Sequence, residues 1–195
     1  MAKIRTRCRI RKEYPKLAVC ITMYNEDIEE LKHTLRGCLH NYNTCKLDPS
    51  LKFTKDDFLV AVVVDGYDKI PAEFKNLARA KGFLDEEVLF QKGFMETNRE
   101  NEFKMRPMKD LMDGDVPDNK VPSNLLHCFQ VTTWDFGIDD SILKGRRINF
   151  MFCIKQRNDG KINSHKWFFQ AVCKYLKPQY TLMLDIGTKP DNYSI

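Results

Sequence analysis

The run FLVAVVV, residues 58–64, is the feature that most limits how this chain can fold. A strand without polar residues has to be covered on both faces, as strands of parallel sheets are. The apolar run of residues 16–22 has the same character, and residues 27–42 between the two runs carry apolar side chains at helical spacing. Strands that alternate with helices predict an α/β domain with a mainly parallel sheet.

The rest of the chain extends this pattern. Pro71 and Gly82 bracket a predicted short helix, and residues 160–177 form a second amphipathic segment. Residues 92–122 lack periodicity and contain three prolines, which indicates an irregular insertion. The further predicted strands cover residues 86–92, 124–134, 147–156 and 179–187.

Charge is concentrated at the start of the chain, whose net charge is +5. Six basic residues precede the first acid, so residues 1–14 form a basic lead-in that either meets phosphates or an anionic membrane face, or is simply solvated. No apolar run approaches the roughly 18 residues needed to span a bilayer. The seven cysteines form no CxxC pair, which favours reduced thiols over a zinc site.

Polar residues follow three of the predicted strands directly. The sequences are TMYNED from Thr22, DGYDK from Asp65 and DIGTKP from Asp185. A carboxylate at a strand end can accept a hydrogen bond from a sugar hydroxyl or bind a divalent cation, and a neighbouring glycine lets a ligand approach the backbone. Ligands of open α/β sheets bind beyond the carboxyl ends of the strands, so a site is expected there.

The predicted helix at 160–177 begins with a crowd of polar groups, Lys161, Asn163, Ser164 and His165. They either cap the helix and face solvent, or they bind an anion such as a diphosphate at a helix N-terminus. The residues alone leave both interpretations open.

Four stretches together resemble one family: CITMYNED, VVVDGYDKI, CIKQRNDGKINSHKWFF and LMLDIGTKP. They are similar to the donor-binding half of the catalytic domain of chitin synthases, processive membrane-bound enzymes of the inverting glycosyltransferase family 2. The resemblance implies that residues 15–195 are the N-terminal part of a GT-A domain, a Rossmann-like fold, truncated here. It implies UDP-N-acetylglucosamine as donor, a growing chitin chain as acceptor and Mg²⁺ or Mn²⁺ as cofactor.

The resemblance also implies roles for single residues. Tyr24 would lie beside the uracil, Lys161 would counter the diphosphate, and Asp185 would bind the metal. His165 would bind substrate or pin its helix to the sheet. The other positions expected to hold the uridine are Thr22, Glu26 and Asp65.

No catalytic residue is assigned, because in this family the general base and the polymer-gripping motif lie downstream of the stretches matched here. We therefore expect the isolated chain to be inactive. The parent enzyme would build cell-wall chitin at the plasma membrane, anchored by downstream helices, with this domain on the cytoplasmic side. No nucleic-acid partner is expected, and a homodimer stays open.

Two other functions are compatible with the sequence. One is a different polysaccharide synthase that uses UDP-glucose or UDP-glucuronate. The other is a non-catalytic basic module that contacts nucleic acid through residues 3–12, which predicts salt-sensitive binding. The acids at three strand ends argue against the second, since they repel phosphates unless a cation is present.

Overall fold

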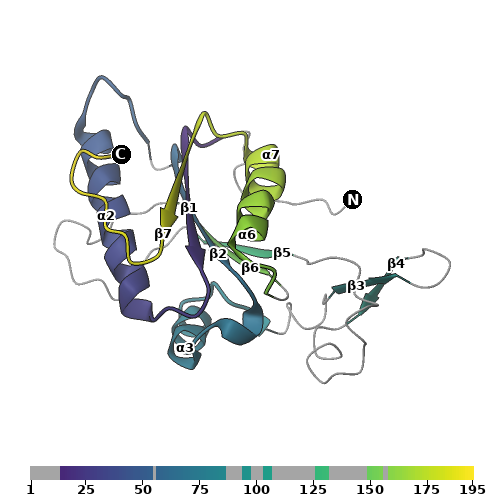
Figure 1. Cartoon of the computed structure of the whole chain (residues 1–195). Helices are drawn as coiled ribbons and strands as arrows, with labels where there is room; N and C mark the ends of the chain where they lie inside the picture. The colour runs from purple at the N-terminus through teal and green to yellow at the C-terminus, as the bar shows by residue number, and fades with distance from the viewer. Residues whose placement is uncertain are drawn as a thin grey trace.

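A five-stranded sheet forms the centre of the computed structural model, in the order β5–β6–β2–β1–β7 (Figure 1). Strands β1, β2, β6 and β7 pair in parallel, and β5 runs antiparallel at one edge, so the expected mainly parallel sheet is confirmed. The strands are β1 (Leu17–Met23), β2 (Phe58–Val64), β5 (Leu126–Val131), β6 (Asn149–Lys155) and β7 (Tyr180–Asp185). The structure describes residues 14–54, 56–86, 94–97, 103–106, 126–131, 149–155 and 158–195.

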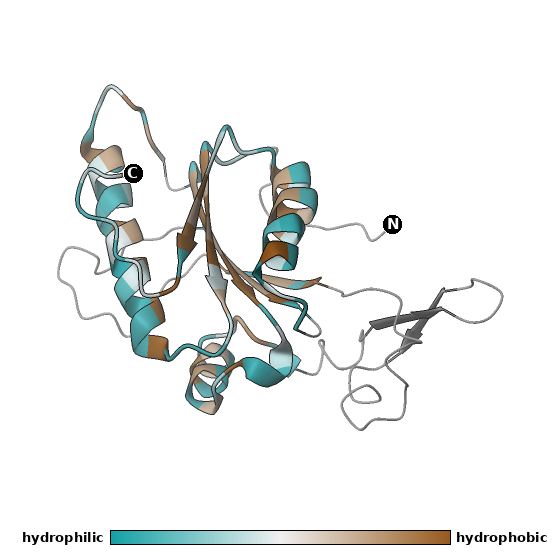
Figure 2. Ribbon diagram, viewed as in Figure 1, coloured by the Kyte–Doolittle hydropathy of each residue, from teal (hydrophilic) through white to brown (hydrophobic). Residues whose placement is uncertain are grey.

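Helices cover both faces of the sheet (Figure 1). One face packs against α2 (Ile28–Leu47) and α3 (Ala72–Ala80), and the other against a continuous helical segment, α6 (Lys161–Trp167), η3 (Phe168–Cys173) and α7 (Lys174–Leu176). Figure 2 shows brown, apolar residues concentrated on the strands between the helices. Every residue of β2 and β6 is buried, as the uninterrupted apolar run of β2 predicts. No helix in the described ranges is long and apolar enough to cross a membrane.

The insertion differs in part from its prediction. Within residues 92–122, β3 (Phe94–Thr97) and β4 (Phe103–Arg106) pair antiparallel, so the expectation of irregular structure is wrong for these two strands. They are too short for a sequence period to reveal them. Apart from Glu86, the strand predicted at 86–92 falls outside the described residues, as does the basic lead-in apart from Tyr14.

The register of the sheet brings the carboxyl ends of four strands to one edge. Thr22 of β1 lies opposite Asp185 of β7, and Val64 of β2 lies opposite Ile154 of β6. The backbone N–H of Asp65 donates to the carbonyl of Met23 at 2.8 Å, which continues the β1–β2 ladder beyond β2. Whatever follows these strands therefore shares one rim of the sheet.

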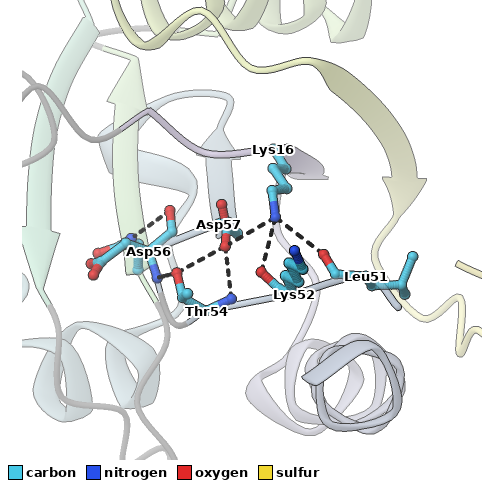
Figure 3. A network of polar contacts seen from close by, with 7 residues as sticks. Lys16, Leu51, Lys52, Thr54, Asp56 and Asp57 are labelled. Carbon is cyan, nitrogen blue, oxygen red and sulfur yellow. Dashed lines mark hydrogen bonds and ion pairs between the residues drawn. The ribbon is translucent and has the colours of Figure 1, made fainter. Parts of the chain in front are cut away.

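At the opposite end of the sheet, Lys16 binds the loop that connects α2 to β2 (Figure 3). Its ammonium donates to the carbonyls of Leu51 at 3.2 Å and Lys52 at 3.0 Å and lies 3.5 Å from the carboxylate of Asp57. Asp57 in turn accepts from the backbone N–H of Thr54 at 2.7 Å. This network is structural, because it lies away from the rim where the strands end.

The residues after β7 return along α2. The side-chain amide of Asn41 donates to the carbonyl of Asp191 at 2.9 Å, and its oxygen accepts from the N–H of Ile195 at 3.0 Å. Gly37, one turn earlier, faces Pro190 so closely that an added Cβ would lie 2.5 Å from the proline Cδ. The docked tail therefore fixes the path of the chain as it leaves β7.

A second polar cluster holds the segment that follows Asp65. The hydroxyl of Tyr67 donates to the carboxylate of Glu86, which also receives two hydrogen bonds from Arg79, at 2.6 and 2.8 Å. These bonds, those from Arg79 first, hold the pKa of Glu86 below its ordinary value of 4.5. Burial and the bond to Glu86 raise the pKa of Tyr67. The two bonds from Arg79 join the end of α3 to Glu86, and the bond from Tyr67 joins the segment after Asp65 to the same carboxylate.

Replacing Glu86 with glutamine should reduce stability in a pH-dependent way. A carboxyl whose pKa is lowered by folding stabilises the protein above its unfolded pKa, and this contribution is lost as the pH falls through the lowered folded value. The difference in free energy of unfolding between wild type and Glu86→Gln is therefore expected to shrink from pH 6 toward about pH 3. Urea titrations across this range, with the exposed α3 acid changed in Glu73→Gln as control, measure it. A difference that stays constant with pH contradicts the prediction.

Candidate functional site

A cavity of about 400 Å³ opens at the rim where the parallel strands end. Its volume falls in the range of roughly 300–1,000 Å³ that is typical of sites for small molecules and cofactors. Its walls come from the carboxyl ends of β1 and β7, from the residues just after β1, β2 and β7, and from the turn before α6 and the start of that helix. The lining residues are Thr22, Met23, Tyr24, Glu26, Asp65, Asn158, Gly160, Lys161, Ser164, Asp185 and Ile186.

Most of the side chains expected to bind substrate or metal are brought together here. Six of them line the cavity: Thr22, Tyr24, Glu26, Asp65, Lys161 and Asp185. His165 is not among the lining residues, although it is the last of the groups whose charge lowers the pKa of Asp185. His165 is therefore close to the site without forming its wall.

Lys161 and Asp185 form an ion pair across the cavity, and the hydroxyl of Thr22 donates to Asp185 Oδ1 at 3.3 Å. The hydrogen bond from the Lys161 ammonium is the main cause that lowers the pKa of Asp185 below its ordinary value. The Coulomb attraction of Lys161 and the hydrogen bond from the Thr22 hydroxyl lower it further. Both charged side chains are about half exposed, so the pair adds little to stability. It places one anion and one half-exposed cation at the cavity.

The turn after β1 is held by its own acid. Glu26 Oε2 accepts a hydrogen bond of 2.6 Å from the backbone N–H of Tyr24. This bond fixes the turn and keeps the Glu26 carboxylate at the cavity wall. The half-buried Tyr24 side chain offers an aromatic surface at the same wall.

Asp65 is held by a residue that the sequence did not point to. Lys155, the last residue of β6, is completely buried, and its ammonium lies 2.6 Å from Asp65 Oδ1. The same oxygen accepts from the backbone N–H of Asp159 at 2.9 Å. A lysine that closes an otherwise apolar strand run was the available signal, but a strand end normally lets such a side chain reach water.

The turn before α6 completes the wall. Gly160 has a φ of 78°, a left-handed conformation that glycine adopts without strain, and an added Cβ would meet nothing within 4 Å. Its N–H donates to the side chain of Asn158 at 3.0 Å. Asn158 is a lining residue that sequence reasoning missed, since one asparagine in a polar loop has no distinguishing pattern.

The residues present fit a divalent metal that is bound by one protein carboxylate together with phosphate oxygens of a substrate. Asp185 offers an exposed carboxylate whose partner, Lys161, is also about half exposed, whereas the buried Asp65 is paired with the completely buried Lys155. In the part of the chain that the structure describes, no three His, Cys, Asp or Glu residues cluster as a metal site. Mg²⁺ is commonly bound by one or two carboxylates plus substrate phosphates. Asp185 therefore suits a metal that enters with a diphosphate.

The described cysteines take no part in such a site. All of them are free thiols, and burial raises the pKa of Cys20 and of Cys38 to about 12 and that of Cys173 to about 11. These thiols are neutral at physiological pH and are poor metal ligands and nucleophiles there.

Comparison with known proteins identifies the family. A sequence model described as "Chitin synthase-like glycosyltransferase domain" matches residues 17–102 and 108–195. This chain belongs to that family. The domain is 28% identical over 201 residues to "Chitin synthase 3" of Verticillium dahliae, an alignment that covers 98% of the chain and 20% of the relative. It is also 28% identical over 200 residues to "Chitin synthase 1" of Mycosarcoma maydis, covering 92% and 19%.

The expected family and its α/β fold class are therefore confirmed. The chitin synthase-like glycosyltransferase domain spans about a fifth of the length of these two relatives. Both matched segments of the domain contribute to the cavity, the first through the residues after β1 and β2 and the second through α6 and β7.

Proposed function

We propose that the cavity is the donor site of a chitin synthase and that the domain has the GT-A fold. The donor is UDP-N-acetylglucosamine, and its sugar passes with inversion to the growing end of a β-1,4-linked chitin chain. One observation carries this proposal: six side chains that the motif resemblance assigns to donor or metal binding line a single cavity. They come from three strand ends and one helix start.

The nucleoside is bound at the β1–β2 side of the cavity. Tyr24 stacks on the uracil, a contact worth about 1–3 kcal/mol by analogy with aromatic residues in single-strand binders. Asp65, Glu26 and the oxygen of the Thr22 hydroxyl supply acceptors for the base and ribose. Each of these groups is already held by the protein at one atom or more, so little ordering is needed when the nucleotide enters.

The diphosphate is bound at the α6–β7 side. Lys161 is half exposed, so its ammonium can leave Asp185 and contact the diphosphate. His165 lies one turn after Lys161 on α6 and also acts on Asp185 by its charge. Positive charge held where the leaving group develops negative charge stabilises the transition state.

Asp185 holds the divalent metal, Mg²⁺ or Mn²⁺. When bound, the metal neutralises charge on the leaving diphosphate. Lys161 lowers the pKa of Asp185 below an ordinary value that is already acidic, so this carboxylate is ionised throughout the physiological range.

The acceptor site and the general base belong to the rest of the enzyme in this proposal. The proposal places the parent protein at the plasma membrane, with this domain on the cytoplasmic side, where it serves cell-wall synthesis. It is compatible with a homodimer. The isolated chain is then inactive. Incorporation of labelled N-acetylglucosamine into insoluble polymer by the purified chain alone would contradict this part of the proposal.

The donor site is tested by calorimetric titration of the purified chain with UDP, with and without MnCl₂. Manganese is expected to strengthen UDP binding to the wild type. In the presence of manganese, Asp185→Ala is expected to bind UDP about tenfold more weakly than the wild type, which corresponds to the loss of one charged contact. Asp191→Ala, which changes an exposed acid outside the cavity, is the control. An equal manganese effect in Asp185→Ala and wild type would remove the metal role of Asp185.

The identity of the sugar is tested by competition. UDP-N-acetylglucosamine should displace a fluorescent UDP analogue at lower concentration than UDP-glucose or UDP-glucuronate. A preference for either of the other two sugars would place the domain in a different polysaccharide synthase.

A further inference from the structure

We propose that Lys155 is a positioning residue of the donor site, acting through Asp65 and through the turn at 158–160. It fixes the Asp65 carboxylate by one oxygen, Oδ1, and leaves Oδ2 as the acceptor for the ligand. The inference rests on the proposed function in taking that ligand to be a uridine nucleotide.

The first argument is the completeness of the contacts around the Lys155 ammonium. A lysine ammonium has three N–H donors. Its nitrogen lies within hydrogen-bond distance of Asp65 Oδ1 at 2.6 Å, the carbonyl of Gly160 at 3.2 Å and the hydroxyl of Ser164 at 3.3 Å. A buried charge is tolerated when it is paired and its donors are satisfied, and these contacts meet that condition.

The second argument is where Lys155 lies relative to the cavity. Its side chain is completely buried and does not line the cavity, whereas Asp65, Gly160 and Ser164 all do. Lys155 therefore lies behind the wall and contacts three of its members. Any effect it has on a ligand must pass through those residues.

The third argument is that one ammonium joins both halves of the proposed donor site. Asp65 belongs to the nucleoside side, after β2. Gly160 immediately precedes Lys161, the residue of the diphosphate side, and the N–H of Asp159 bonds to the same Asp65 oxygen at 2.9 Å. Lys155 thus fixes the separation between the acceptor for the nucleoside and the cation for the diphosphate.

A double-mutant cycle on the 195-residue chain tests the inference. UDP affinity is measured by calorimetry for Lys155→Met, Asp65→Asn and the double variant, with Lys174→Met, an exposed lysine of α7, as control. Each single change is expected to weaken UDP binding about tenfold, corresponding to one lost charged hydrogen bond. The double variant is expected to bind UDP no more weakly than the single variant that binds it more weakly. Affinities that multiply, or a wild-type affinity in folded Lys155→Met, would overturn the inference.

A measurement without ligand separates this inference from the proposed function. In an ¹H–¹⁵N NMR spectrum, the Asp159 amide signal reports the bond to Asp65 Oδ1. It is expected to move in Lys155→Met and, by a smaller amount in the same direction, in Ser164→Ala, which leaves no buried charge unpaired. An unmoved signal in Ser164→Ala and in any folded Lys155→Met overturns the inference. Failure of the wild type to bind UDP, with the signal moving as expected, contradicts the proposed function alone.

Discussion

Replacing Asp65 with alanine is expected to lower the free energy of unfolding by about 3–5 kcal/mol, the range measured when one partner of a buried ion pair is removed. The cause is Lys155. Its ammonium is completely buried and would keep only the Gly160 carbonyl and the Ser164 hydroxyl as partners. A buried charge without a counter-charge is far less favourable than the same charge in water. Guanidinium titrations followed by circular dichroism measure the change.

Two comparisons give this result its meaning. Asp159→Ala removes a neighbouring exposed acid whose backbone N–H, not its carboxylate, contacts Asp65, and it should change stability by less than about 0.5 kcal/mol. The double variant Asp65→Asn with Lys155→Met has no unpaired charge, so it should be more stable than Asp65→Ala. A loss in Asp65→Ala no greater than in Asp159→Ala would mean that water reaches the lysine.

Replacing Gly37 with alanine is expected to lower the free energy of unfolding by about 1–3 kcal/mol, as overpacking does. In an exposed helix interior the same change would be stabilising by about 1 kcal/mol. Here the added Cβ would lie 2.5 Å from Pro190 Cδ and 2.9 Å from the backbone nitrogen and oxygen of Pro190. Backbone and a proline ring cannot rotate away, so the tail has to move. The loss is measured by urea titration.

Hydrogen exchange shows where the Gly37→Ala effect is located. The N–H of Ile195, which bonds to Asn41, and that of Ser194 should exchange faster because the tail no longer docks on α2. Arg36→Ala, on the adjacent and more exposed position of the helix, should leave both rates unchanged. A Gly37→Ala protein that is more stable than wild type with unchanged tail protection would contradict the prediction.

The main sheet was predictable because its signals are local. The apolar run of β2, the helical spacing of α2 and the apolar run of β6 each depend on burial of a continuous segment, and each predicted element overlaps the observed one. The strands β3 and β4 were not predicted, because four residues are too few to show a period among prolines and charged residues.

Some residues of the candidate site have a local sequence signal and others do not. Asp65, directly after β2, and Asp185, the last residue of β7, could be named from the sequence, since the rim of a parallel sheet is where ligands bind. Lys155 could not, because a charged side chain at a strand end is ordinarily solvated. Its burial depends on α6 and the turn before it closing over the end of β6, which no local pattern records.

The α/β class, the family motifs and the polar groups at three strand ends all follow from residues that are neighbours in the chain, so they can be derived without a structure. Which charged side chains pair with one another depends on how distant segments pack in the folded protein. Asp65 and Asp159 are 94 positions apart, and the parallel register of β2 and β6 brings their segments together. That register is set by packing of the whole sheet between its helices, so the pairing of Lys155 with Asp65 is a property of the fold and not of any one motif.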